Sequence, residues 1–223
     1  IAFDVFADVE PNPRDSTIHR GAEIARAAGS DLFVGFGGGS AMDAAKGIAL
    51  LMTNPGEVAD YDGINKVAND LPFLVAVPTT AGTGSEVTAN AALTNSQTHV
   101  KMSLRSPRLL PRLTVVDPGL LRSLPKATAS TAGLDALAHA VEGYLSVRAS
   151  PLSDVFAIEA IRLIGANLRA FVANPENADA AAGMALGALL AGFVISNTGT
   201  GNDHAIARAL GGVFDTPHGL ATG

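Results

Sequence analysis

Apolar runs and glycine-rich breaks alternate along the first half of the chain. The run DLFVGF at residues 31–36 stops at GGGS, after which AMDAAKGIALLM carries apolar residues at helical spacing. A second apolar run, PFLVAVP at residues 72–78, leads into TTAGTGSEVT, which is too rich in Gly and Thr to form a helix or a strand. These patterns predict a strand, a glycine turn and a helix, then a second buried strand and a loop.

A hairpin and a further strand complete this half. The segments ANAALT and HVKMSL flank the turn residues NSQ, and LTVVD at residues 113–117 has the composition of another buried strand. Strands that alternate with helical pattern are typical of an α/β domain. The two prolines of DPGLLRSLP mark the end of this pattern, so we expect an α/β dinucleotide-binding domain at residues 1–125 and a second domain at residues 126–223.

The second half of the chain has a purely helical pattern. Three segments, at residues 128–146, 150–172 and 178–197, carry apolar residues at helical period, and β-branched runs disappear. The alanine richness of the last third is typical of closely packed helices. The pattern therefore predicts an all-helical second domain.

Composition limits the kinds of partner. Apolar residues make up 48% of the chain and charged residues 16%, and we expect no apolar run near the ~18–20 residues that a membrane span needs, so the sequence predicts a soluble protein with no membrane partner. A net charge of −6 without a Lys/Arg cluster argues against nucleic acid and favours a small molecule. With no cysteine, a metal must be held by His, carboxylate and water, and a reducing cytoplasm fits.

The glycine turn after the first strand has a geometry that suits a phosphate. A turn at the carboxyl end of a strand, opening a helix, exposes backbone N–H groups at the positive end of the helix dipole. It lacks the G-x-G-x-x-G and P-loop spacings, and Ser40 with Asp43 also matches a capping box, which would serve only to begin the helix. Four glycines, Gly35 and Gly37 to Gly39, exceed the need of one cap, so we interpret the surplus as close approach of a ligand.

The threonine-rich loop offers five hydroxyls after the next strand. They could clamp ribose, amide or phosphate oxygens, or they could belong to a polar surface loop. In an open parallel sheet, ligands collect at the carboxyl ends of strands, where both this loop and the glycine turn are expected. We therefore favour binding.

Histidines in the helical half suggest a metal site. Asp135 and His139 are four residues apart, so on a helix they can reach one ion, although the same spacing is common in a plain surface pair. The segment GNDHAIARALGGVFDTPHG adds His204, expected at the start of a short helix, and His218, expected in a loop. A carboxylate and three imidazoles without sulfur suit Fe²⁺ or Zn²⁺ with a position open for substrate. Beside a nicotinamide, such a Lewis acid serves hydride transfer.

Five motifs in this order, GGGSAMDAAK, VPTTAGTGSEVT, DPGLLRSLP, GLDALAHAVEGY and HAIARALGGVFDTPHG, closely resemble those of the iron-containing (group III) alcohol dehydrogenase family. The resemblance covers nearly the whole chain. It implies a Rossmann-like α/β domain that binds NAD or NADP, and an all-helical domain that binds a divalent metal, Fe²⁺ or alternatively Zn²⁺. It also implies an enzyme that interconverts a small-molecule alcohol and an aldehyde or ketone, and a homodimer or higher homo-oligomer.

The resemblance also implies roles for particular residues. The metal ligands of the family match Asp135, His139, His204 and His218, and Glu142 matches a residue that orients a ligand imidazole. The cofactor contacts of the family match Gly38, Gly39, Ser40 and Asp43 in the glycine turn and helix, Thr79, Thr80, Thr83 and Thr88 in the loop, and Asn90 and Lys101 in the hairpin.

The chain departs from the family pattern in two respects. Many members that oxidise alcohols carry a histidine four residues after the third ligand, where this chain has Arg208. A guanidinium does not relay protons near neutral pH, but it can pair with an anionic substrate or simply form a salt bridge. The resemblance also begins after the first strands of the family and stops before its last helices, so we expect a chain truncated at both ends.

Alternatives within the same fold remain open. They include glycerol or glycerol-phosphate dehydrogenase, and maleylacetate reductase or a hydroxy-acid dehydrogenase, whose substrates are acidic. A sugar-phosphate cyclase such as dehydroquinate synthase would use NAD and zinc for lyase chemistry, but it needs a basic phosphate pocket, for which Arg208 is the one candidate. A non-catalytic fragment that retains the fold is the last alternative.

Overall fold

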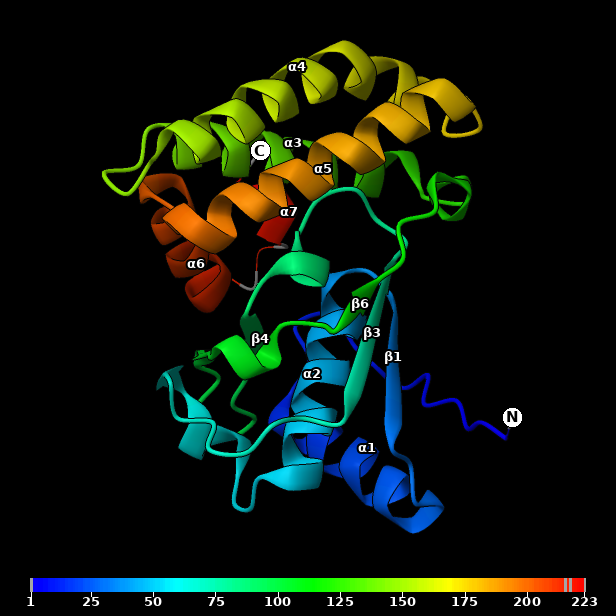
Figure 1. Ribbon diagram of the computed structural model, residues 1–223, viewed down its shortest axis with the longest axis vertical. Coiled ribbons are helices and arrows are strands. Elements are labelled where there is room, and N and C mark those ends of the chain that lie inside the picture. Colours follow the sequence, from blue (N-terminus) through cyan, green and yellow to red (C-terminus); the bar gives the residue numbers. More distant parts are fainter. Residues whose placement is uncertain (1, 215, 217, 223) are drawn as a thin grey trace. The chain divides into compact units, whose positions relative to one another are not determined.

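The computed structural model describes residues 2–214, 216 and 218–222, without the side chains of Arg208 and Val213. The chain forms two compact units (Figure 1). The α/β unit comprises residues 1–77 and 89–115, and the helical unit comprises residues 78–88 and 116–223. The threonine-rich loop thus groups with the helices, and the chain enters them at residue 116, before the domain boundary expected at residue 125.

The α/β unit contains two small sheets with helices. Its order along the chain is α1 (Asp15–Ala28), β1 (Leu32–Gly37), α2 (Gly39–Thr53), β2 (Gly63–Ile64), β3 (Phe73–Pro78), β4 (Asn90–Thr94), β5 (Lys101–Arg105) and β6 (Leu113–Thr114), with 3₁₀ turns at Val58–Tyr61 and Pro107–Leu109. The sheets have the strand orders β1-β3-β6 and β2-β5-β4. Strands β3 and β6 are parallel, whereas β4 and β5 form an antiparallel hairpin.

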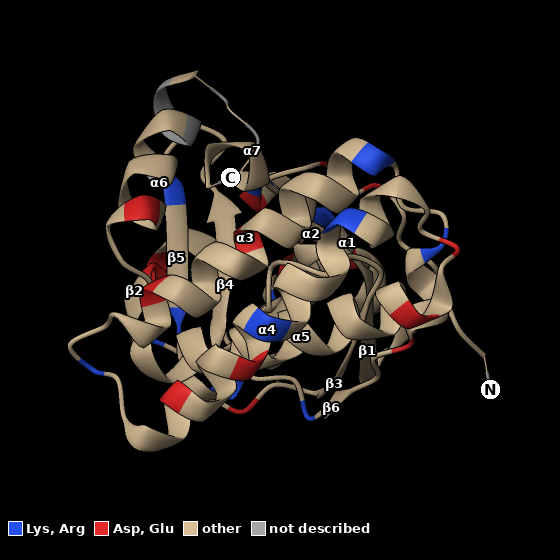
Figure 2. Ribbon diagram, turned by 90° about the horizontal axis from the view of Figure 1, so that it is seen from above, with Lys and Arg blue, Asp and Glu red and all other residues tan. Residues whose placement is uncertain are grey.

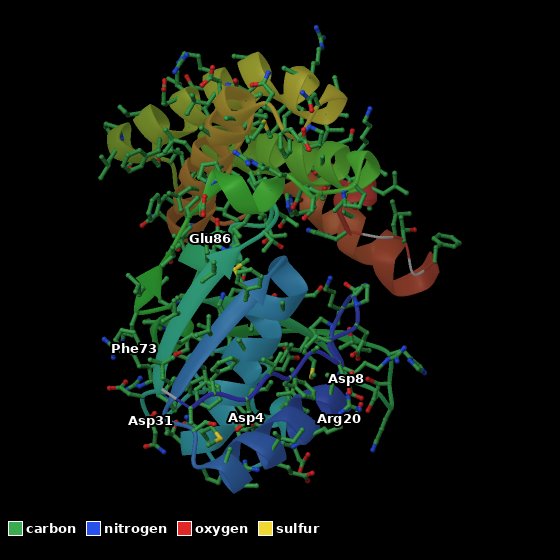
Figure 3. The ribbon with its side chains drawn as sticks, turned by 90° about the vertical axis from the view of Figure 1, so that its right-hand side faces the viewer. Asp4, Asp8, Arg20, Asp31, Phe73 and Glu86 are labelled. Atoms are coloured by element: carbon green, nitrogen blue, oxygen red, sulfur yellow. The ribbon has the colours of Figure 1, made fainter. Side chains whose placement is uncertain are left out.

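The first sheet positions the glycine turn. Figure 3 shows Asp31, just before β1, and Phe73, at the start of β3, at the same end of this sheet, so the two strands run in the same direction. Strand β1 therefore delivers its carboxyl end directly to the turn that begins α2. The predicted strands and hairpin are confirmed, although the strand expected at residues 113–117 is limited to Leu113–Thr114.

Helix α1 is an element that the sequence analysis did not predict. It ends at Gly29, whose φ of 66° is in the left-handed region and whose N–H donates to the carbonyls of Ala25 and Arg26. Its buried Ile18 packs in one hydrophobic core with Ile48 of α2 and Leu93 of β4. The glycine after an amphipathic segment is the sequence signal that would have revealed this helix.

The helical unit contains α3 (Lys126–Tyr144), α4 (Pro151–Ala173), α5 (Ala178–Thr198), α6 (Asn202–Phe214) and α7 (His218–Ala221), with 3₁₀ turns at Ser85–Val87 and Pro118–Leu121. Apart from Pro78, the last residue of β3, its described residues form no strand, so the helical pattern predicted for residues 126–223 is confirmed. Helix α4 begins with Pro151 behind a capping box between Ser150 and Ser153. His218 was expected in a loop, but it begins α7 instead.

Small residues let α3, α4 and α5 pack closely. Ala136 and Ala140 of α3, Ala160 of α4 and Ala191 of α5 are fully buried in one core. This packing matches the expectation drawn from the alanine content. It fixes α3, which carries the acidic and imidazole residues of interest.

Helix α5 is apolar enough to resemble a membrane span. Its most apolar window has a mean hydropathy of 1.8, so the expectation that no segment approaches such a span is wrong for this helix. Half of that window is buried, and α5 packs against α3 and α4. Burial in the core of the helical unit accounts for its apolar composition.

Two glycines hold the threonine-rich loop against the helices of this unit. A Cβ on Gly82 would lie 2.6 Å from the carbonyl oxygen of Ala132 in α3. Gly84 has a φ of 65°, and a Cβ there would lie 2.7 Å from the Cα of Gly192 in α5. Part of the glycine content of the loop therefore serves helix packing.

Candidate metal centre and glycine turn

Helix α3 presents an acidic residue and an imidazole on one buried face. Asp135 and His139 are separated by one helical turn and are 2% and 3% exposed. The Nε2 of His139 lies 3.9 Å from the Oδ1 of Asp135. Near-complete burial rules out the surface-pair interpretation, so these two residues need partners inside the protein.

Helices α6 and α7 supply those partners. The Nε2 of His204, from the first turn of α6, lies 3.4 Å from the Oδ1 of Asp135, and the Nε2 of His218, from α7, lies 3.7 Å from the same oxygen. The rings of His139 and His204 are stacked with centroids 4.5 Å apart. We call these four residues, which the helical unit brings together around one carboxylate oxygen, the Asp135 cluster.

The spacing of the Asp135 cluster fits a divalent ion. Ligand atoms bound at about 2.1 Å to a tetrahedral ion are about 3.4 Å apart, close to the distances from Oδ1 to the imidazoles. The ligand atoms of Asp135, His204 and His218 all lie within 4.8 Å of one another, whereas His139 joins them through its distance to Asp135. Among the described residues, the buried Nε2 of His204 has no hydrogen-bond partner, as expected of a ligand atom.

The electrostatics of the Asp135 cluster favour the ligand forms of Asp135 and His139. Burial would raise the pKa of Asp135, but its attraction to the surrounding imidazoles, first His139 and then His204, holds that pKa below its ordinary value. Burial lowers the pKa of His139, and the attraction of Asp135 opposes this only in part. An ionised carboxylate and a neutral imidazole are the forms that bind metals. Burial would lower the pKa of His204, but the carboxylates of Asp135 and Glu142 raise that pKa overall.

Glu142 fixes the orientation of His204. One turn after His139 on the same helix, its Oε2 lies 2.6 Å from the Nδ1 of His204, and its Oε1 accepts a hydrogen bond of 2.7 Å from the N–H of Asp203. Burial would raise the pKa of Glu142, but the N–H of Gly201 and the imidazole of His204 lower it overall. Glu142 therefore holds the first turn of α6 and directs Nε2 of His204 toward Asp135.

The glycine turn leaves the start of α2 uncapped. Helix α2 begins at Gly39 behind Gly38, and no side chain makes a capping hydrogen bond there. Ser40 lies inside the first turn, so the capping-box interpretation of Ser40 and Asp43 is wrong. Gly37 has a φ of 147°, and a Cβ there would lie 2.7 Å from the Cβ of Ala41. The turn thus presents the backbone at the positive end of the helix.

Asp43 and Lys46 tie α2 to the hairpin within the α/β unit. The Oδ2 of Asp43 accepts a hydrogen bond from the N–H of Ala92, and Lys46, which is fully buried, donates to the carbonyl of Asn90 at 2.7 Å. The two charged groups are 3.6 Å apart. Sequence reasoning missed Lys46, although a lysine three residues after an aspartate within an apolar helix was the signal for a buried pair.

The remaining expected cofactor contacts are dispersed. In the hairpin, Asn90 pairs with Arg105 at one end and Thr94 with Lys101 at the other. The Asn90 side chain accepts a hydrogen bond from Ser103, and the exposed Lys101 donates to Asn12. The structure therefore does not bring Asn90 and Lys101 together. The four loop threonines that were expected as cofactor contacts are all partly buried, namely Thr79, Thr80, Thr83 and Thr88.

A cavity of about 280 Å³ lies beside α3 in the helical unit, and none of the four members of the Asp135 cluster is among its lining residues. Its lining is mainly apolar and comes from one side of α3, with Glu142, Asp203 and Thr222 as its polar residues and Leu134, Leu137, Ala138 and Val141 as its apolar ones. No Lys or Arg is among these lining residues. The side chain of Arg208, expected near the site, lies outside the described residues.

Comparison with known proteins gives consistent matches. The profile of the iron-containing alcohol dehydrogenases matches residues 1–118, and the C-terminal profile of the Fe-containing alcohol dehydrogenase family matches residues 128–223. A 1,3-propanediol dehydrogenase from Citrobacter freundii is 46% identical over 217 residues, which are 97% of this chain and 56% of that protein. These matches cover both units.

Comparison with solved structures gives the same result as comparison of sequences. A 1,3-propanediol oxidoreductase superposes with a TM-score of 0.96 at 45% identity over 98% of this chain and 57% of that one. A sulfoacetaldehyde reductase from Bifidobacterium kashiwanohense, solved with NAD⁺, does so with a TM-score of 0.91 at 35% identity over 99% and 59%.

The sequence motifs implied two features, and the structure has both. One is an α/β unit with a glycine turn at the start of a helix, and the other is a helical unit with a cluster of metal-ligand side chains that contains no sulfur. With the profile matches they settle the class. The chain belongs to the iron-containing alcohol dehydrogenase family. It spans little more than half the length of the relatives it matches.

Proposed function

We propose that the protein is an NAD(P)- and divalent-metal-dependent oxidoreductase that interconverts a small-molecule alcohol and an aldehyde or ketone by hydride transfer. The observation that carries the proposal is the convergence of three imidazoles on the Oδ1 of Asp135. A buried carboxylate together with imidazoles and without cysteine suits Fe²⁺ or Zn²⁺. Family membership makes Fe²⁺ the first choice.

The helical unit would hold the metal through the Asp135 cluster. When bound, a divalent ion supplies Lewis acidity, which lowers the pKa of an alcohol or polarises a carbonyl. Asp135 provides the anionic ligand and His139 a neutral one. Glu142 keeps His204 in the tautomer whose Nε2 is available to the ion.

The α/β unit would hold the cofactor, NAD or NADP. The backbone of Gly38, Gly39 and Ser40 at the uncapped start of α2 suits the pyrophosphate. The contacts of Asp43 with Ala92 and Lys46 favour a role in holding α2 in place. The further contacts proposed for the ribose, amide and phosphate groups are Thr79, Thr80, Thr83, Thr88, Asn90 and Lys101.

We propose a neutral alcohol or aldehyde as the substrate. The cavity beside α3 is lined mainly by apolar residues, and two of its other lining residues, Glu142 and Thr222, bond to His204 and Asp135. Its acidic residues, Glu142 and Asp203, would repel an anion. A reductase of an acidic substrate is the second candidate, because the chain is 35% identical to a sulfoacetaldehyde reductase and carries Arg208 one turn after His204. Family membership favours either oxidoreductase over a sugar-phosphate cyclase.

The proposal extends to assembly and location. We propose a homo-oligomer, with a homodimer as the simplest case, in the cytoplasm, and the functional domains at residues 1–125 and 126–223. Basic residues are interspersed with acidic ones along the ribbon rather than gathered into a stripe, which supports a small-molecule partner over nucleic acid (Figure 2).

The test uses the full-length chain purified anaerobically. Elemental analysis should find stoichiometric iron or zinc, and NADH absorbance should fall with 3-hydroxypropanal or simple aldehydes. Release of phosphate from a sugar phosphate without NADH consumption would instead indicate a cyclase. A metal-free protein that consumes no NADH with any aldehyde would indicate a non-catalytic protein.

The substrate choice is tested with neutral and carboxylated aldehydes on the natural chain and on Arg208→His. A neutral substrate predicts that the natural chain already prefers neutral aldehydes and that Arg208→His changes the ratio of kcat/KM values little. A strong preference for carboxylated aldehydes that Arg208→His abolishes would favour the second candidate.

A further inference from the structure

The short helix α7 and Thr222, the residue that follows it, direct two polar groups at the same carboxylate oxygen. The Nε2 of His218 lies 3.7 Å from the Oδ1 of Asp135, and the Oγ1 of Thr222 lies 2.9 Å from it. Thr222 follows His218 by one helical turn, and its N–H donates to the carbonyl of His218 at 3.1 Å. The imidazole and the hydroxyl therefore lie on one face of the helix.

The Thr222 hydroxyl donates to the carboxylate. A hydroxyl has one proton, and two acceptors are near this one, namely Oδ1 of Asp135 at 2.9 Å and the carbonyl oxygen of His218 at 3.3 Å. The carboxylate oxygen is closer and carries a negative charge, so it accepts the hydrogen bond. Thr222 is 8% exposed and Asp135 is 2% exposed, which limits the access of water that could replace this bond.

Helix α7 is held close to α3, so the hydroxyl is well placed. A Cβ on Gly219 would lie 3.0 Å from the backbone oxygen of Thr131 in α3. The absence of a side chain at Gly219 lets the backbones of the two helices approach. Thr222 thus reaches Asp135 from a fixed position.

We propose that Thr222 is a positioning residue of the metal centre, whose hydroxyl keeps Oδ1 of Asp135 directed at the three imidazoles. The inference rests on the proposed metal-dependent function. Among the described contacts, Thr222 bonds the aspartate ligand in the way that Glu142 bonds the ligand His204. A ligand side chain that a second residue holds in place binds metal more tightly, because the side chain is already fixed before the metal binds.

The test measures binding of Co²⁺ alone to the metal-free full-length chain, by competition with a chelator and by visible absorption. Thr222→Val removes the hydroxyl at nearly constant volume, and Thr222→Ser keeps it. We expect about tenfold weaker Co²⁺ binding and a shifted spectrum for the valine variant, and affinity within about threefold of the natural chain for the serine variant. Leu220→Ala, an exposed position of α7, is the matched control and should leave Co²⁺ binding unchanged.

The outcomes separate this inference from the proposed function. A natural chain that binds Co²⁺ together with a valine variant of equal affinity and spectrum would overturn the role of Thr222 and leave the metal site standing. A natural chain that binds no Co²⁺ would overturn both. If Thr222→Val lowers the Tm of the metal-free protein, the Thr222→Ser variant decides between the outcomes. A tenfold loss of Co²⁺ affinity in this variant, which is folded and retains the hydroxyl, would contradict the inference.

Discussion

The glycine turn of the α/β unit and the Asp135 cluster of the helical unit are built by opposite means. The turn consists of backbone, and it depends on what its residues lack, since a Cβ at Gly37 would lie 2.7 Å from Ala41. The cluster consists of side chains that α3, α6 and α7 bring to one buried oxygen. One site is contiguous in sequence, and the other spans residues 135 to 218.

This difference predicts separable failures. A substitution in the cluster should remove the metal and leave the backbone of the turn intact, because no side chain of the cluster belongs to the α/β unit. A side chain added to the turn should weaken NADH binding and leave the metal in place. Substitutions in each site, with both metal content and NADH binding measured, therefore test whether the two sites are independent.

The largest effect is expected from His204→Ala. The variant removes an imidazole that is 2% exposed and leaves Asp135 and Glu142 without their shared partner. We expect the purified protein to lose its metal, and alcohol oxidation to fall at least about 1000-fold, since Lewis-acid stabilisation contributes several kcal/mol. Elemental analysis and the rate of NADH formation provide the measurement.

The control for His204→Ala is His99→Asn, an exposed histidine with a φ of 57°, a conformation that asparagine tolerates. This variant should keep its metal and its activity. NADH fluorescence titration should give a Kd within about twofold for both variants. Full activity of a metal-free His204→Ala protein would contradict the role assigned to the Asp135 cluster.

Gly37→Ala should produce the opposite failure. The substitution places a side chain at a φ of 147° and against Ala41, at a strain of about 1–3 kcal/mol, so the turn must shift. We expect NADH binding to weaken up to about 100-fold while the metal content stays stoichiometric. Gly29→Ala is the matched control, since it has a φ of 66° but no atom within 4 Å of its added Cβ. An unchanged Kd for NADH in Gly37→Ala would remove the turn from the cofactor site.

The sequence predicted most of the fold because local patterns determine most of it. Helices α3 to α5 and strands β1 and β3 appear where periodicity placed them. Strand β2 was missed, since two residues carry no period and depend on pairing with β5. The placement of the threonine-rich loop also could not be read locally, because it depends on contacts of Gly82 and Gly84 with distant helices.

The candidate site was predicted unevenly for the same reason. The motifs supplied the four members of the Asp135 cluster and Glu142, because their identities stand in recognisable segments. Thr222 was missed, because its hydrogen bond to Asp135 joins residues that are 87 positions apart, and a threonine most often has an ordinary structural role. Lys46 was missed although Asp43 stands three residues before it, and its hydrogen bond to the carbonyl of Asn90 joins two segments that are distant in the sequence.

Glu142→Gln sharpens the comparison within the helical unit. The variant keeps the shape and an acceptor for the first turn of α6, but it removes the charge beside the Nδ1 of His204. We expect about tenfold weaker Co²⁺ binding, because His204 is no longer held in one tautomer. Glu159→Gln changes a partly exposed glutamate that is paired with Arg162, and it should leave Co²⁺ binding unchanged. Equal Co²⁺ affinity in Glu142→Gln would mean that α6 alone orients His204.

The smallest effect concerns the hairpin of the α/β unit, where Asn90 and Lys101 stand at opposite ends of β4 and β5. A separation of four residues along a strand is roughly 13 Å, so the two side chains cannot hold the same phosphate or ring. The side chain of Asn90 accepts a hydrogen bond from Ser103, and its backbone carbonyl, which alanine would keep, accepts one from Lys46. Lys101 is exposed and bonded to Asn12. We therefore expect the Kd for NADH to rise about threefold in Asn90→Ala and less than about twofold in Lys101→Ala. A larger rise in Lys101→Ala, reduced by added salt, would show instead that the far end of the hairpin contacts a cofactor phosphate.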